Sequence, residues 1–331
     1  MVSDSALAVL FVGFVGSGLV CFFALRIAET LQLATPPNER SSHTRATPNI
    51  GGLGIVVPVL VYLGSVAPVF PSLWALFGAL TLLALVGLVD DLRDVGRRWR
   101  LLMQLLAASL CLLAFAPGLA GWLWPLLLLA LLWHVNLYNF MDGIDGLAGA
   151  QALAYVLAAL WIAPDMMAWL GYLLCVLAGA LIGFLVYNWP PARMFMGDSG
   201  STVLGLLLAA VALLLAQTGH LALPASLILL SAFWVDATYT LLVRISTGQP
   251  FASPHRSHLY QRLTDRFGHR AVTLMFCAYA FFWLFPLALY AQTLKLPFSL
   301  LPLAFAAVPL VWGARRLRAG LPDHKDGGLQ S

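Results

Sequence analysis

The chain has 331 residues, of which 61% are hydrophobic and only 10% are charged. Soluble globular chains carry roughly 25% charged residues, so 18 basic and 14 acidic side chains are too few to cover a water-exposed surface of this size. The composition indicates an integral membrane protein and excludes a disordered chain, a coiled coil and a disulfide scaffold. The four cysteines each lie in an apolar run, where a thiol packs as a small hydrophobic group.

Apolar runs follow one another along almost the whole chain, with short polar breaks between them. A helix needs about 20 apolar residues to cross a bilayer, and a backbone in lipid must satisfy its own hydrogen bonds. Because Leu and Ala dominate the runs, we predict an all-α integral membrane protein, a bundle of ten to eleven transmembrane helices. Asp4, in the place of a basic residue, favours a retained first span over a cleaved signal peptide. The expected spans are 5–26, 51–70, 73–89, 101–116, 120–139, 147–163, 168–187, 200–217, 222–243, 272–292 and 299–314.

These spans predict a single polytopic domain over residues 1–316, followed by a polar tail over 317–331. With eleven spans the two chain ends lie on opposite faces, and every Lys and Arg except Lys295 falls on one of them. Basic residues concentrate in cytoplasmic loops, so we expect this face and the C-terminus to be cytoplasmic and the N-terminus to lie outside. The polar loops expected on the cytoplasmic face are 27–50, 90–100, 140–146, 188–200 and 244–271.

Two adjacent acids, Asp90 and Asp91, end the third expected span and are followed by Arg93. Ionisable groups at the mouth of a membrane protein are costly unless they are paired, hydrated or bound to a metal, so they are functional candidates. Adjacent residues point about 100° apart on a helix, so one acid can face a cavity while the other faces a neighbouring helix or a cation. A simple stop signal is a weaker interpretation, because acids oppose the helix dipole at a C-terminus.

A second polar run carries oxygen-bearing side chains at a spacing of three, which places them along one face if the helix continues. Glycines at 143, 146 and 149 interrupt this helix and would let a backbone approach a ligand closely. Hard oxygen ligands suit Mg²⁺ and phosphate better than zinc, and a polar re-entrant loop without catalysis is the alternative. The four residues are Asn136, Asn139, Asp142 and Asp145.

Asp198 lies in the segment F-M-G-D-S-G-S, just ahead of the next apolar run. Asp or Ser at such a position is often an N-cap of the following helix. A helix N-terminus also binds anions, so a phosphate there, with Asp198 holding a divalent cation, is the functional alternative.

Two polar loops complete the candidate site. Residues 38–52 contain Glu39, Arg40, His43 and Arg45 in a loop that no span requires, which is compatible with an entry loop. The longest loop contains His255, Arg256 and His258. Arg binds phosphate in a bidentate manner and imidazoles can donate to hydroxyls, so this loop suits a nucleotide diphosphate or a sugar.

In their order and spacing these motifs resemble the polyprenyl-phosphate N-acetylhexosamine-1-phosphate transferases of glycosyltransferase family 4, over nearly the full chain. The resemblance rests on P-N-E-R-S-S-H, D-D, N-x-x-N-x-x-D-G-x-D-G-L-A and F-M-G-D-S-G-S. It implies transfer of a phospho-N-acetylsugar from a UDP-sugar to undecaprenyl phosphate with release of UMP, at the cytoplasmic face of a bacterial inner membrane. It also implies Mg²⁺, or Mn²⁺ in its place, as the cofactor and membrane lipid as a partner. A homodimer is compatible with this resemblance, and no nucleic acid partner is expected.

The resemblance further implies roles for individual positions. At least one of Asp90 and Asp91 would act on the lipid phosphate as base or nucleophile, and Asp198 and Asn139 would bind the metal. The remaining implied contacts are Asp145, Asn188 and Phe195 with the uridine, Asp142 and Arg256 with the diphosphate, His255 and His258 with the sugar, and His43 in the entry loop.

The histidine loop departs from the family, which often has H-x-H-H where this chain reads His258-Leu259-Tyr260-Gln261. The form H-R-S-H-L-Y-Q resembles the branch that initiates O-antigen, lipopolysaccharide or capsule chains, and the peptidoglycan or teichoic-acid counterpart remains the alternative. A membrane prenyltransferase would need a second D-x-x-x-D motif, which the sequence lacks. A transporter is disfavoured because the acids gather on one face and no half-to-half repeat is visible.

Overall fold

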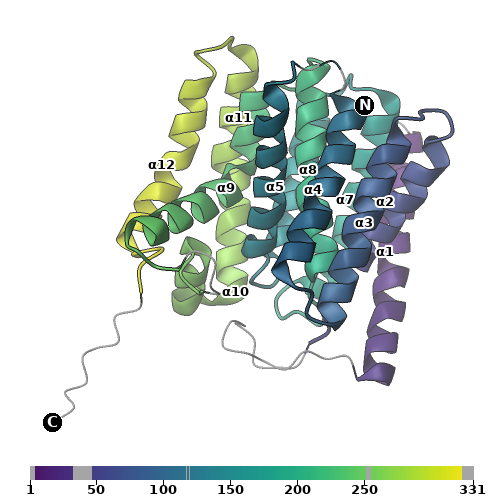
Figure 1. The fold of residues 1–331 in the computed structure, drawn as a ribbon, viewed down its shortest axis with the longest axis horizontal. Coiled ribbons are helices and arrows are strands. Elements are labelled where there is room, and N and C mark those ends of the chain that lie inside the picture. The colour runs from purple at the N-terminus through teal and green to yellow at the C-terminus, as the bar shows by residue number, and fades with distance from the viewer. Residues whose placement is uncertain (1–3, 33–46, 117, 119, 251–254, 323–331) are drawn as a thin grey trace.

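A computed structural model describes residues 4–32, 47–116, 118, 120–250 and 255–322 of the chain (Figure 1). All regular elements in these ranges are helices. They are α1 (Asp4–Leu31), α2 (Leu53–Val66), α3 (Leu73–Leu92), α4 (Arg97–Phe115), α5 (Leu123–Met141), α6 (Leu147–Ile162), α7 (Ala168–Asn188), α8 (Asp198–Gln217), α9 (Leu223–Ser246), α10 (Leu259–Tyr279), the π-helix η1 (Ala280–Leu284), α11 (Phe285–Thr293) and α12 (Leu300–Arg316).

Each predicted apolar run coincides with a helix, if α10, η1 and α11 are taken as the single continuous helix Leu259–Thr293. In the described part of the chain, eight helices are long and apolar enough to cross a membrane by length and composition. The apolar helices α2 and α6 are shorter, with 14 and 16 residues. The prediction of an all-α membrane protein is therefore confirmed.

Successive helices run in alternating directions, so the polar connections gather at one end of the bundle (Figure 1). The first turn of α1 and the last turn of α12 lie at opposite ends, as an odd number of helices requires. We call the end that carries residues 90–100, 141–147, 188–198, 246–250 and 255–259 the polar end. The predicted site residues within the described ranges belong to this end.

The interval 244–271, predicted as one loop, is partly helical in the structure. Helix α9 continues to Ser246, and α10 begins at Leu259, long before the expected span at 272. Hydropathy alone misses this first part of α10 because its residues are mostly polar, although several of them are buried. Gly268, with φ of 78°, interrupts the helix and separates the polar part from the apolar part.

Residues 317–321, predicted as the start of a polar tail, fold back against the bundle and form what we call the C-terminal turn. The backbone N–H of Gly320 donates to the Ser257 carbonyl at 2.8 Å, and the Gln249 side chain donates to the Gly320 carbonyl at 2.8 Å. The Arg262 guanidinium donates to the Leu321 carbonyl at 2.7 Å. The turn therefore secures the segment that precedes α10, and residues 323–331 lie outside the described ranges.

Candidate active site

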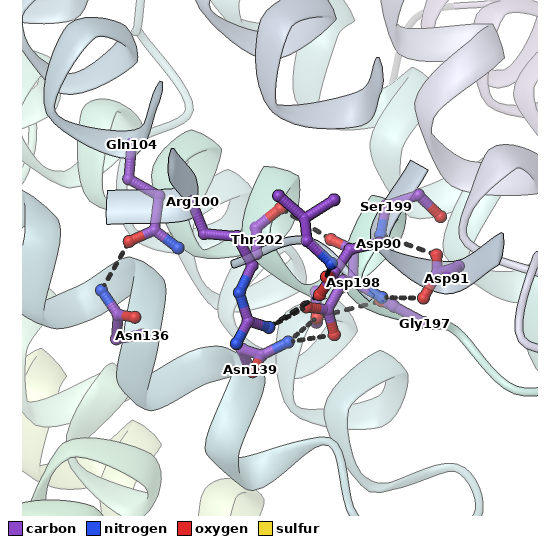
Figure 2. A network of polar contacts seen from close by, with 12 residues as sticks. Asp90, Asp91, Arg100, Gln104, Asn136, Asn139, Gly197, Asp198, Ser199 and Thr202 are labelled. Atoms are coloured by element: carbon purple, nitrogen blue, oxygen red, sulfur yellow. Dashed lines mark hydrogen bonds and ion pairs between the residues drawn. The ribbon is translucent and has the colours of Figure 1, made fainter. Parts of the chain in front are cut away.

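Four helices bring predicted polar residues together at the polar end (Figure 2). The last turn of α3 supplies Asp90 and Asp91, and α8 begins with Asp198. The last turns of α5 supply Asn139, and the first turn of α4 supplies Arg100. We use the term acidic cluster for the three acids among these residues together with the neighbouring Asp142, that is, for Asp90, Asp91, Asp142 and Asp198.

Asp91 caps the N-terminus of α8. Its two carboxylate oxygens accept hydrogen bonds from the backbone N–H groups of Asp198 at 2.8 Å and Ser199 at 3.1 Å (Figure 2). Gly197 makes this approach possible, because a Cβ there would lie 2.6 Å from an Asp91 oxygen and its φ of 71° disfavours other residues. A carboxylate is well placed at a helix N-terminus, where it satisfies free N–H groups and faces the positive end of the dipole.

Asp90 faces a different partner, the guanidinium of Arg100. One Asp90 oxygen accepts from the Val95 backbone N–H and the other from Arg100, both at 2.7 Å. The same Arg100 nitrogen lies 3.3 Å from an Asp198 oxygen, so a single cation links two acids of the cluster. Arg100 carries no motif and counts in the sequence only as one of several basic residues in its loop, so its role at the site was not predicted.

The asparagines of α5 lie on the face predicted for them. The Asn139 amide donates to Asp198 at 2.8 Å and to the Ser201 hydroxyl at 2.9 Å. Asn136, about one turn earlier, donates to the Gln104 side chain at 2.8 Å (Figure 2). The two acids that follow do not share this face, because α5 ends at Met141.

Asp142 follows the last residue of α5 and is partly buried. No hydrogen-bond donor reaches its side chain among the described residues. Burial raises the pKa of Asp142 well above its usual range, and the charges of Asp198, Asp91 and Asp145 raise it further. Among the described residues, no ion pair reaches Asp142, whereas Arg100 pairs with Asp90 and Asp198.

This donor set fits Mg²⁺. Among the described residues, no three His, Cys, Asp or Glu side chains converge as a preformed metal site. Mg²⁺ in phosphate-transfer sites commonly takes only one or two carboxylates and completes its coordination with water and substrate phosphates. The carboxylates of Asp142 and Asp198 and the amide oxygen of Asn139 are hard oxygen donors of this kind.

Asp145 belongs to a separate group of contacts between α7 and α10. Its side chain is buried, and one oxygen accepts from the Ala192 backbone N–H at 2.9 Å. The other oxygen lies 3.1 Å from Nδ1 of His269, and the Thr273 hydroxyl donates to the Asp145 carbonyl at 2.8 Å. His269 stands alone in a polar stretch without a motif, so the sequence gives no signal for it.

Asn188 contacts the residue after Asp145, and it differs from Phe195 in what it exposes. Both polar atoms of Asn188 are used inside the protein: Oδ1 accepts from the Gly146 N–H at 2.9 Å, and Nδ2 donates to the Met194 carbonyl at 2.8 Å. The Phe195 side chain is half-buried, and its backbone N–H donates to the Pro48 carbonyl at 2.8 Å. Asn188 therefore braces the backbone around this region, whereas Phe195 presents part of its ring.

The histidines of the long loop occupy unequal positions. His258 is 3% exposed, and its ring lies between the rings of His255 at 4.9 Å and Tyr260 at 5.8 Å. His255 is half-buried, with Nδ1 3.0 Å from the Ser257 hydroxyl. Burial lowers the pKa of His255 to about 4, helped by the charges of His258 and Arg244. His255 is therefore a neutral ring near the surface, and His258 is a buried ring behind it.

The remaining predicted residues do not add to these groups. Arg256 pairs with Asp265 of α10 at 3.0 Å. His43, with Glu39, Arg40 and Arg45, lies outside the described residues. Asp236 of α9 is a buried acid that no motif predicts. It lies 3.6 Å from Nδ1 of His258 and accepts a hydrogen bond from the Leu259 N–H at 2.8 Å.

Comparison with known proteins identifies relatives of this chain. The profile of glycosyl transferase family 4 matches residues 73–216, which include the predicted acids of the site. The chain is 28% identical over 259 residues to a Bacillus subtilis protein described as a probable undecaprenyl-phosphate N-acetylglucosaminyl 1-phosphate transferase, covering 72% of this chain and 71% of that protein.

Two further relatives are phospho-N-acetylmuramoyl-pentapeptide-transferases. The Synechococcus protein is 36% identical over 264 residues, which cover 66% of this chain and 71% of the relative. The Lactiplantibacillus plantarum protein is 33% identical over 230 residues, which cover 61% of this chain and 70% of the relative. With this similarity, the profile match and the clustered acids at the polar end, the chain belongs to glycosyl transferase family 4, and it is a transferase with a multi-pass helical membrane fold.

Proposed function

We propose that this protein transfers a phospho-N-acetylhexosamine from a UDP-sugar to undecaprenyl phosphate, which yields undecaprenyl-diphospho-sugar and UMP. The observation that carries this proposal is the acidic cluster, with Arg100 and Asn139 bound to it, at the polar end of a membrane-spanning bundle. The names of the relatives support it, since they describe transfer of a sugar 1-phosphate to undecaprenyl phosphate or transfer of a phospho-N-acetylmuramoyl-pentapeptide.

Charge neutralisation is the main task of such a site. Both substrates are anionic phosphates, so their repulsion has to be screened before an oxygen of one can attack the phosphorus of the other. Arg100 supplies a guanidinium that can bind phosphate oxygens in a bidentate manner. Asp90 and Asp198 hold this guanidinium in place, so we assign Arg100 to the diphosphate of the UDP-sugar.

Asp142, Asp198 and Asn139 would hold Mg²⁺ or Mn²⁺. When bound, the ion neutralises the diphosphate and makes the leaving UMP a weaker base. These residues suit a hard metal ion, because their ligand atoms would be oxygens. Among the described residues, no hydrogen-bond donor occupies the Asp142 carboxylate. Asp142 would be the ligand that Arg100 does not contact.

The two adjacent acids take different roles in this proposal. Both oxygens of Asp91 are bound by the backbone of α8, so Asp91 shapes the site. Asp90 is bound by the Arg100 guanidinium on one side, so it can orient this cation toward the substrate phosphates. A phosphomonoester has a second pKa near 6, so the lipid phosphate is largely ionised at pH 7 and needs little base catalysis. We therefore assign Asp90 mainly to positioning the lipid phosphate.

The nucleoside and the sugar would lie toward α10. Asp145 and Phe195 flank the proposed uridine position, with Asn188 holding the backbone behind them. Arg256 keeps its proposed role on the diphosphate side. His255 presents the more accessible ring to the sugar, and the buried His258 supports that ring from behind. His43 stays a proposed entry-loop residue.

We further propose that the reaction initiates an O-antigen or lipopolysaccharide-type glycan in the bacterial inner membrane, with the polar end facing the cytoplasm. The form H-R-S-H-L-Y-Q supports the pathway, and the distribution of basic residues supports the orientation. The peptidoglycan counterpart is the second candidate, because two of the relatives are phospho-N-acetylmuramoyl-pentapeptide-transferases.

The test is UMP release by purified protein with undecaprenyl phosphate, Mg²⁺ and a panel of UDP-N-acetylhexosamines that also contains UDP-N-acetylmuramoyl-pentapeptide. We expect release with one or a few simple UDP-N-acetylhexosamines and formation of the corresponding lipid diphosphate. Release with the pentapeptide donor alone would replace the first pathway by the second. Folded protein that releases no UMP with any donor would contradict the transferase proposal, and flux into vesicles would then test the transporter alternative.

A further inference from the structure

A buried carboxylate in α9 is not part of the acidic cluster. Asp236 is 0% exposed and lies within a helix of membrane-spanning length and composition. An ionisable group in such a segment is costly and is retained only with partners. Its partners are the N–H groups that begin α10: Leu259 donates to one oxygen at 2.8 Å, and Tyr260 to the other at 3.0 Å. The Thr240 hydroxyl adds a third hydrogen bond at 3.2 Å.

The first turn of α10 in turn supports the corner that carries Asp142. The Tyr260 hydroxyl donates to the Phe140 carbonyl at 3.0 Å, two residues before Asp142. Gly143 allows this contact, because a Cβ at that position would overlap the Tyr260 hydroxyl. The Tyr260 side chain is fully buried, so it has little freedom to move away from the corner.

Asp236 also lies beside the histidine segment. Nδ1 of His258 is 3.6 Å from an Asp236 oxygen, and the His258 ring stacks on Tyr260. The carboxylate therefore contacts the residue before the helix and the first two residues within it. A carboxylate suits this position because it offers acceptors to two N–H groups at the positive end of a helix, whereas an amide offers one oxygen.

We propose that Asp236 is a positioning residue, which fixes the first turn of α10 and, through Tyr260, the corner that presents Asp142 to the substrates. This inference rests on the proposed function, in which Asp142 contributes to the metal and diphosphate site. Displacement of a reacting group by about 1 Å can cost about a hundredfold in rate, so support from a neighbouring helix matters for turnover.

A double-mutant cycle tests whether Asp236 acts on the Asp142 corner through Tyr260. It compares Asp236→Asn, Tyr260→Phe and the variant with both substitutions. Asp236→Asn keeps the volume of the side chain, and Tyr260→Phe removes only the hydrogen bond to Phe140. We expect each single variant to lower kcat about tenfold or more, with the KM for undecaprenyl phosphate nearly unchanged. Because the effect of Asp236 passes through Tyr260, the kcat of the double variant should be little lower than that of the less active single variant.

Hydrogen exchange provides a second readout that does not depend on activity. Exchange of amides in 140–146 should rise in both single variants, although Asp236 lies on another helix. The matched control is Ser231→Ala, which removes a buried hydroxyl of α9 that bonds within its own helix and should leave kcat and exchange unchanged.

The proposal would be overturned if the two reductions in kcat multiplied in the double variant. Amides at 140–146 that exchange as slowly in Asp236→Asn as in wild type would also overturn it. If Asp236→Asn does not fold, unchanged exchange at 140–146 in Tyr260→Phe overturns it equally. Wild-type protein without UMP release would refute the proposed function alone, since the exchange result would still show whether Asp236 supports the corner.

Discussion

Asp91 holds Asp198 by its backbone: a carboxylate oxygen of Asp91 accepts a hydrogen bond from the Asp198 N–H at 2.8 Å. The Asp198 side chain is then left to Asn139 and Arg100. One acid thus fixes the position of the other without sharing its side-chain contacts. The two neighbours in the D-D motif consequently differ in function, because Asp90 binds a side-chain cation and Asp91 binds a helix end.

We expect Asp91→Ala and Asp90→Asn to separate stability from catalysis. Loss of an N-terminal cap costs about 0.5–2 kcal/mol, so Asp91→Ala should lower the melting temperature in detergent. Asp90→Asn keeps an acceptor for the Val95 N–H and should melt close to wild type while kcat falls at least tenfold. Thermal melting and UMP release on the same preparations check both statements, and equal melting temperatures for the two variants would contradict this division.

Asp198→Asn should abolish transfer while the protein remains folded. The substitution removes the charge that faces Arg100 and the proposed metal. It leaves the backbone N–H that donates a hydrogen bond to Asp91. We expect less than about 1% of wild-type turnover at saturating Mg²⁺, as for removal of a main electrostatic contact in an active site. Normal activity at high Mg²⁺ would exclude a metal-binding role for Asp198.

Metal removal should have a matching effect on the wild type. Chelation with EDTA should stop UMP release, and added Mg²⁺ should restore it. Mg²⁺ together with UMP should raise the melting temperature of wild type, because a ligand that binds only the folded state stabilises it. The same addition should leave Asp142→Asn nearly unchanged, with Ser109→Ala on the exposed side of α4 as the control that still responds. A full response in Asp142→Asn would remove this residue from the metal site.

Arg100 should respond differently to Lys and to Gln. Its single NH1 atom contacts Asp90 at 2.7 Å and Asp198 at 3.3 Å, and the planar guanidinium also has donors left for phosphate. We expect Arg100→Gln to raise the KM for the UDP-sugar about tenfold or more and Arg100→Lys to recover only part of this. Initial rates at varied UDP-sugar distinguish the two variants. A Lys variant that matches wild type would show that charge alone suffices.

The two loop histidines should separate donor choice from helix stability. His255 is half-buried and His258 is 3% exposed, so only the first can present much of its ring to a sugar. We expect His255→Ala to change the order of preference among UDP-N-acetylhexosamines. His258→Ala should lower the melting temperature and reduce turnover with every donor to a similar extent. A change of donor preference in His258→Ala alone would reverse this assignment.

The sequence was sufficient for the apolar helices and for most of the acidic cluster, but not for the polar first part of α10. Hydropathy located the apolar runs, and the helices follow them because a chain in lipid has few other ways to satisfy its backbone. Asp90, Asp91, Asn139 and Asp198 carry recognisable motifs, so their assembly could be predicted before the fold was known. The separate position of Asp145 depends on where α5 ends and on contacts with His269, which spacing along the chain does not encode.

Residues without a motif were missed. Arg100 is distinguished from its neighbours Arg97 and Arg98 only by the direction in which α4 leaves Gly96, and that direction is a tertiary property. Asp236 did carry a usable signal, since an acid within an apolar span is rare and usually has a function. Its partners are backbone N–H groups of another helix, and no side-chain pattern in the sequence predicts those hydrogen bonds.

The C-terminal turn sets a practical boundary for engineering this protein. A truncation after α12 would delete the backbone groups that Ser257, Gln249 and Arg262 bind, and would release the segment that leads to His258. A purification tag or fluorescent fusion attached beyond Pro322 keeps all three contacts. Shortening the chain to its last helix would therefore disturb the segment before α10, although it removes only what resembles a dispensable tail.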